Sequence, residues 1–184
     1  MRVSFLLRNV EKWDIMRVGF LVWEELKVKL VGFVETKFFK NDFFKDVLKV
    51  VAKTPLSDSE VVIFGVVLEL LQKKCIQEGI EKEDLGYVNV IISDDGSYAF
   101  EADENDEEAY GHYTQNIIYP MNNIRRKPDP RFVAMAFTEE LVDFIWPKLS
   151  EKEVKYQVIE ILKPIIKDID SKTMRSFGII MEDY

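Results

Sequence analysis

Eight carboxylates and no basic residue occupy the segment from Asp94 to Glu108, which makes it the stretch of the chain with the clearest chemistry. Removing these eight from the 33 acids of the chain leaves 25 acids against 25 bases, so the whole formal charge of −8 lies in this segment. A charge confined to one segment attracts cations or a basic partner, whereas the same charge spread evenly would mainly affect solubility. The sequence therefore predicts an acidic docking surface.

The predicted docking loop runs from Glu101 to Glu108. The carboxylates from Asp103 to Glu108 repel one another and no base is interleaved, so we expect this stretch to be a solvated loop with little structure of its own. The charges would speed association and select the partner, while aromatic anchors would supply affinity. The residues predicted to bind the partner are Glu101, Asp103, Glu104, Asp106, Glu107, Glu108, Tyr98, Phe100, Tyr110 and Tyr113.

The expected partner is a basic protein surface, such as that of a nucleic-acid-processing enzyme, because inhibitors of such enzymes present carboxylates where the enzyme binds phosphates. The sequence thus favours a noncatalytic interaction protein of the inhibitor or immunity type. A plainer alternative is that the acidic loop only keeps the protein soluble, with the function on another surface. Net negative charge disfavours direct binding of nucleic acid, which depends on Lys and Arg.

Metal and cofactor chemistry finds little support in the residue types. Residues 103–107 place oxygen ligands at alternate positions, as calcium loops do, but Glu108 and Thr114 stand where that motif has glycine and a bidentate glutamate. One cysteine, Cys75, and one histidine, His112, are too few for a structural zinc site. We expect Cys75 to be a core residue rather than a nucleophile paired with His112, and we expect no cofactor or bound metal.

Two carboxylate patterns support an alternative function, a metal-dependent hydrolase or nuclease. Glu35 and Lys37 form a Glu-x-Lys pair on a predicted strand, as in some magnesium-dependent nucleases. Residues 139–143 have the spacing of the His-Glu-x-x-His zinc helix, but with acids in place of both histidines they are not that site. A helical wheel places Glu140 within the apolar face of that helix, where a carboxylate needs a partner, such as an arginine from 125–131, or a raised pKa.

The bulk composition indicates a folded cytoplasmic protein. The chain is 47% hydrophobic, and 184 residues suit one domain, with a subdivision near 79–86 as the alternative. A single cysteine fits a reducing compartment, and no apolar run reaches the length of a membrane span. The basic cluster at 125–131 is expected to pair with the acidic segment or to face solvent.

Helix signals are strongest in the middle and at the end of the chain. Capping boxes at Ser57-Glu60 and Ser150-Glu153 begin two helices, and Asp129 before Pro130 begins a third. The first should be a central buried helix ending near Gly79, because residues 61–71 are apolar nearly all round. Apolar spacing also predicts helices from about residue 11 and over 41–51.

Strand signals lie mainly in the centre of the chain. Alternating residues around Asp95-Gly96 predict a hairpin over about 87–102, and short β-favouring runs predict strands at 28–38, 115–119 and 177–181. The expected fold class is α+β, with a small antiparallel sheet, made of the hairpin and one or two further strands, packed against four to five helices.

Overall fold

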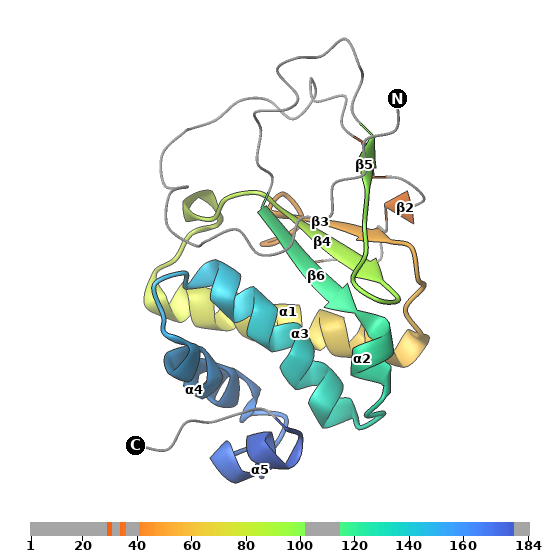
Figure 1. The fold of residues 1–184 in the computed structure, drawn as a ribbon. Helices are drawn as coiled ribbons and strands as arrows, with labels where there is room; N and C mark the ends of the chain where they lie inside the picture. Colours follow the sequence, from red (N-terminus) through yellow and green to blue (C-terminus); the bar gives the residue numbers. More distant parts are fainter. Residues whose placement is uncertain (1–28, 31–33, 36–40, 102–114, 179–184) are drawn as a thin grey trace.

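The computed structural model describes residues 29–30, 34–35, 41–101 and 115–178, which form a mixed sheet with helices on one side (Figure 1). The strands are β1 (Lys29–Leu30), β2 (Val34–Glu35), β3 (Leu48–Ala52), β4 (Val88–Ser93), β5 (Phe100–Glu101) and β6 (Gln115–Pro120). The helices are α1 (Asp58–Glu78), α2 (Met121–Arg125), α3 (Pro130–Ile145), α4 (Glu151–Leu162) and α5 (Ser171–Ser176), with a 3-10 turn η1 (Lys82–Asp84).

The main sheet has the order β2-β3-β4-β6, and the strands β3, β4 and β6 are parallel. Only β2 joins this sheet antiparallel, at its outer edge. The predicted antiparallel sheet is therefore wrong, and so is the 87–102 hairpin: β4 pairs with β3 and β6, whereas β5 pairs with β1. The helix α1 connects β3 to β4, which allows these two strands to run in the same direction.

The central strand β4 is buried on both faces along its whole length. Its alternate residues Val88, Val90 and Ile92 belong to the hydrophobic core shared with the helices. Asn89 and Ile91 point to the opposite face, where the Asn89 amide donates to Asn116 Oδ1 of β6 at 3.1 Å. Burial on both faces is typical of parallel sheets, whose strands read as continuous apolar runs.

The helix predicted over 41–51 is wrong, because residues 42–47 form turns and the remainder is strand β3. Asn41 does cap this segment, since its Oδ1 accepts hydrogen bonds from the backbone N–H groups of Phe43 and Phe44, each at 3.1 Å. The turns then lead into a five-residue strand in which Val50 and Val51 are both buried, on opposite faces of the sheet.

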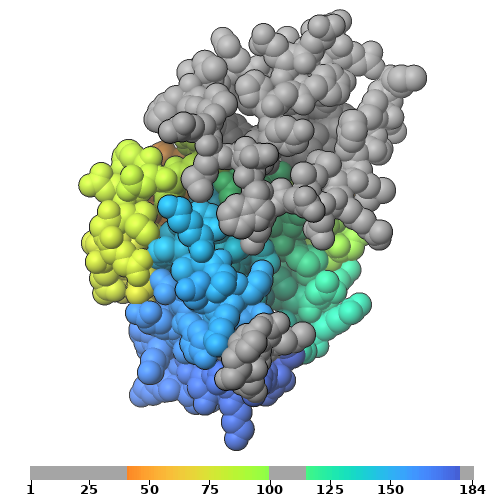
Figure 2. All heavy atoms as spheres, turned by 60° about the vertical axis from the view of Figure 1, so that its left-hand side comes forward, coloured from red at the N-terminus to blue at the C-terminus, as the bar shows by residue number. Residues whose placement is uncertain are grey.

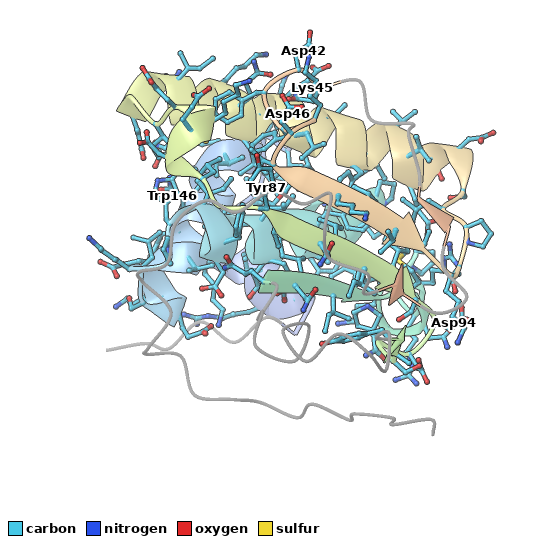
Figure 3. The ribbon with its side chains drawn as sticks, turned by 90° about the horizontal axis from the view of Figure 1, so that it is seen from above. Asp42, Lys45, Asp46, Tyr87, Asp94 and Trp146 are labelled. Atoms are coloured by element: carbon cyan, nitrogen blue, oxygen red, sulfur yellow. The ribbon has the colours of Figure 1, made fainter. Side chains whose placement is uncertain are left out.

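Helix α1 begins and ends where the sequence predicts. Ser57 and Glu60 form the capping box, and Gly79 ends the helix in the left-handed conformation at φ 71°. The prediction of a central buried helix is wrong, because only one face of α1 is buried, and Val62 on the other face is 64% exposed. Figure 3 shows α1 along one margin of the molecule, with Asp42, Lys45 and Asp46 beside it.

The helices α3 and α4 confirm the predicted starts at Asp129 and Ser150. Helix α3 packs against β6, α1 and α4, and the T-shaped ring contacts between Phe64, Tyr119 and Phe137 join α1, β6 and α3 into one core. Cys75 lies in this core as predicted. Helix α4 ends at Leu162, before Pro164.

Several predicted elements fall partly or wholly outside the described residues. The predicted strand at 28–38 contains the short strands β1 and β2, and the predicted strand at 115–119 is β6. The predicted helix from residue 11 lies outside the described residues. Of the predicted strand at 177–181, Phe177 and Gly178 form a turn, and the rest lies outside the described range.

Candidate functional site

The carboxyl ends of the parallel strands bring two residues of the acidic segment to the surface. Asp94 and Asp95 directly follow β4 and are exposed (Figure 3 labels Asp94). The Asp94 carbonyl accepts from the Asn122 N–H at 2.8 Å, and Asp95 Oδ1 accepts from the backbone N–H and the hydroxyl of Ser97, at 2.9 and 2.6 Å. Gly96 completes the turn at φ 85°. The backbone that carries both carboxylates is therefore held in place.

The charge of these two carboxylates is not cancelled by direct pairing. No ion pair among the described residues involves Asp94 or Asp95. The hydrogen bonds from Ser97 lower the pKa of Asp95, and the charge of Lys53 lowers it slightly further. The Asp95 carboxylate is thus ionised at neutral pH, and both side chains face solvent.

A salt bridge closes the adjacent corner of this edge, where α1 begins. Arg125 Nε and Nη2 donate to Glu60 Oε1 and Oε2, each at 2.8 Å, and Nη2 also donates to the Pro55 carbonyl at 2.8 Å. The Glu60 side chain is only 9% exposed, yet its pKa is lowered to about 2, chiefly by the hydrogen bonds from Arg125 and against the opposing effect of burial. Ser57 lowers the pKa further. This corner is a fixed ion pair rather than a free binding group.

Two further bases of the 125–131 cluster, Lys127 and Arg131, also bind within the chain, but their partners among the described residues are not the acids of the acidic segment with which pairing was predicted. Arg131 binds Asp129 at 2.8 Å and Asp168 at 3.2 Å. Lys127 donates to the carbonyl of Phe177. The acids that these bases bind lie outside the acidic segment, so none of these pairs involves Asp94 or Asp95.

Three of the ten residues predicted to bind a partner lie in the described part of the chain. Tyr98 is half-buried, and burial raises its pKa. Phe100 and Glu101 form β5, which pairs with β1 and does not return along β4. The other seven, all within 102–114, lie outside the described residues: Asp103, Glu104, Asp106, Glu107, Glu108, Tyr110 and Tyr113.

The two described residues of the predicted hydrolase site, Glu35 and Glu140, are not brought together. Glu35 lies in β2 at the outer edge of the sheet, and strands β3 and β4 separate it from β6, against which α3 packs. Lys37 lies outside the described residues. Glu140 on α3 is exposed, so its predicted place within the buried face is wrong. The buried arc of α3 extends through Ala134 and Thr138, which moves its centre away from Glu140.

The half-buried carboxylate of α3 is Glu139 instead. Burial raises its pKa; the charge of Lys155 on α4 acts in the opposite direction, and the carboxylates of Glu151 and Asp143 raise the pKa further. The four-residue spacing of Glu139 and Asp143 was the sequence signal for this pair. Among the described residues, however, no group of three or more His, Cys, Asp and Glu side chains is arranged to hold a metal ion.

No helix of the described residues is both long and apolar enough to cross a membrane. Comparison of the chain with protein-family models, with curated protein sequences and with solved structures finds no match. Among the described residues, the carboxyl edge of the parallel strands is the place where exposed carboxylates of the acidic segment lie on a fixed backbone.

Proposed function

We propose that this chain is a noncatalytic cytoplasmic interaction protein that docks a basic protein surface at the carboxyl edge of its parallel strands. The observation that carries the proposal is the pair Asp94 and Asp95: two adjacent exposed carboxylates on a backbone fixed by hydrogen bonds, with no ion pair among the described residues. The acidic segment continues from this pair through Glu101 to Glu108.

A protein surface rich in Lys and Arg, such as the phosphate-binding groove of a nucleic-acid-processing enzyme, would bind such an acidic edge. Carboxylates on a fixed backbone need little backbone ordering when they bind a partner. Their contribution is mainly to association rate and partner choice, and it weakens as salt screens the charges. Edges where parallel strands end are also common ligand-binding positions in sheets of this kind.

The test is a fluorescence-anisotropy titration of a labelled nona-arginine peptide with the full chain, at low and at raised salt. The double variant Asp94→Asn/Asp95→Asn removes two charges while the asparagine oxygen at 95 still accepts the turn hydrogen bonds. We expect about fivefold weaker binding at low salt, because the variant removes two of the charges that attract the peptide. A second variant with amides at all six acids between Glu101 and Glu108 should weaken binding more.

A matched control removes two exposed acids from the other end of the sheet. Glu81 and Glu83 precede the amino end of β4, and the variant Glu81→Gln/Glu83→Gln changes the net charge by the same amount. Its binding should change much less than that of the edge variant. Equal losses in both double variants would show that the peptide senses only total charge, and the docking proposal would fail.

A further inference from the structure

The outward face of α1 is a stripe of exposed and half-buried residues with an exposed apolar side chain near each end. Val62 is 64% exposed and Ile76 is 62% exposed, and Val66 between them is half-buried. A helix that packs one face on a core normally presents polar residues on the other, whereas a helix that is apolar all round is normally covered. The C-terminal half of α1 and the segment after it, yellow-green in Figure 2, form part of the outer surface. The exposed stripe is therefore suited to a protein partner.

The residues of the stripe are spaced symmetrically along the helix. Within the helix, the four inner residues of the stripe occur at intervals of 3, 4 and 3 residues, which keeps them on one face, and the order of intervals is the same in both directions. Two copies of α1 placed antiparallel across a two-fold axis would therefore match position by position. The stripe comprises Val62, Val66, Glu69, Lys73, Ile76 and, just past the helix end, Ile80.

The charges in the middle of the stripe are complementary to those of a second copy of the chain, which makes a second copy the expected partner. Glu69 and Lys73 are exposed, and neither forms an ion pair among the described residues. In the antiparallel match Glu69 lies opposite Lys73 of the second copy, and the two-fold axis repeats this pair. On each side of the two charge layers, Val66 lies opposite Ile76 of the second copy.

The outermost layer places Val62 against a shallow pocket at the end of α1. Phe43, Ile76, Gly79 and Ile80 form the apolar part of the lining, and charged residues of 81–83 form its rim. The segment before β3 holds Phe43 there, because Asn41 Nδ2 donates to Gln72 Oε1 of α1 at 3.0 Å. In the antiparallel match, Val62 of one copy would therefore pack against the apolar lining of this pocket in the other copy.

We propose that α1 mediates an isologous homodimer through this self-complementary stripe, with two Glu69–Lys73 ion pairs between the copies. A single helix from each copy buries area at or below the low end of stable interfaces, about 1,200 Å². The dimer is therefore weak and forms in a concentration-dependent manner. This inference does not depend on the docking function proposed above, because no residue of the stripe belongs to the acidic segment.

The test is sedimentation velocity on the full chain from about 1 μM to about 1 mM, which spans weak dimers. Glu69→Lys puts two ammonium groups opposite each other in both charge layers and should weaken the dimer by at least about tenfold. Lys73→Glu should do the same with carboxylates. The double variant Glu69→Lys/Lys73→Glu restores both pairs with reversed polarity, so dimerisation should return to the wild-type range.

A second probe, Val62→Ser, should weaken the dimer without any change of charge. All three substituted side chains are exposed, so folding should be unaffected, and circular dichroism verifies that each variant is folded. A wild-type chain that stays monomeric throughout the range would overturn the proposal. So would a dimer that tolerates Glu69→Lys, or one that the double variant does not restore.

Discussion

Glu60 links the start of α1 to α2, and its protonation should control much of the acid sensitivity of the fold. Its carboxylate accepts two hydrogen bonds from Arg125 and further hydrogen bonds from the backbone N–H and hydroxyl of Ser57, at 2.7 and 2.9 Å. These bonds stabilise the ionised form, so the pKa of Glu60 falls from 4.5 to about 2 in the folded chain. Replacing Glu60 by glutamine removes the charge but keeps the shape and one hydrogen-bond acceptor.

The free energy follows from the difference in pKa between the folded and unfolded states. A fall from 4.5 to about 2 corresponds to about 3 kcal/mol of stability, as an upper value. Because the folded pKa is the lower one, this stability is fully present above about pH 5 and is lost as the pH falls toward 2. We therefore expect Glu60→Gln to lower the free energy of unfolding at pH 7 by about 2 to 3 kcal/mol and to flatten its dependence on pH between 5 and 2.

The chain provides a matched control in its second capping box. Glu153 accepts the same two bonds from Ser150, at 2.7 and 2.6 Å, but it is exposed and no arginine among the described residues binds it. Urea unfolding of both glutamine variants at pH 7 and pH 3 separates the contribution of Arg125 from that of the cap. If the two variants lose equal stability and show the same pH dependence, the assigned role of Arg125 is wrong.

Two further predictions concern the core. Tyr119→Phe should lower the free energy of unfolding by about 1 kcal/mol, because the buried Tyr119 hydroxyl donates to the Phe137 carbonyl at 2.7 Å; unchanged stability in urea would contradict this contact. Burial raises the pKa of Cys75 to about 11, so a thiol reagent at pH 8 should modify the native chain at least about 100-fold more slowly than the unfolded chain. Modification of the native chain at the unfolded rate would show that the thiol is accessible.

The helix boundaries were predictable because the signals that set them are local. The capping boxes at Ser57 and Ser150 and the glycine at 79 act within one helical turn, and all three appear in the structure where the sequence places them. The order and direction of the strands depend instead on contacts between distant segments. The segment Leu48–Ala52 is short, and the spacing of its apolar residues fits a helix as well as a buried strand.

The sequence nevertheless contained a signal for parallel strands. The apolar run at the centre of β4 has no polar residue from Val90 to Ile92, which is typical of a strand buried on both faces. A strand, then the long helix α1, then this strand is the order of a β-α-β unit. The turn at Asp95-Gly96 obscured it, because that dipeptide favours hairpins, yet here it leads the chain away from β4.

In the candidate site, too, the features set by local sequence were predictable, whereas those that depend on packing between distant segments were not. The acidic segment is visible from composition alone, and Asp94 and Asp95 are exposed because they follow the end of a strand. Glu140 was misplaced because a helical wheel weights large apolar residues, whereas α3 also buries Ala134 and Thr138; the Thr138 hydroxyl donates to the Ala134 carbonyl at 2.7 Å and so needs no other partner.

The two proposals fit together through the direction of α1. This helix begins at the carboxyl edge of the sheet, beside the corner closed by Arg125, and runs for 21 residues, or about 30 Å. An antiparallel pair of such helices places the acidic edges of the two copies at opposite ends of the paired helices. A basic partner with two suitably spaced sites would bind both edges, and the second contact would benefit from a raised effective concentration. By reciprocity, such a partner would strengthen the weak dimer to the same degree that the dimer strengthens docking.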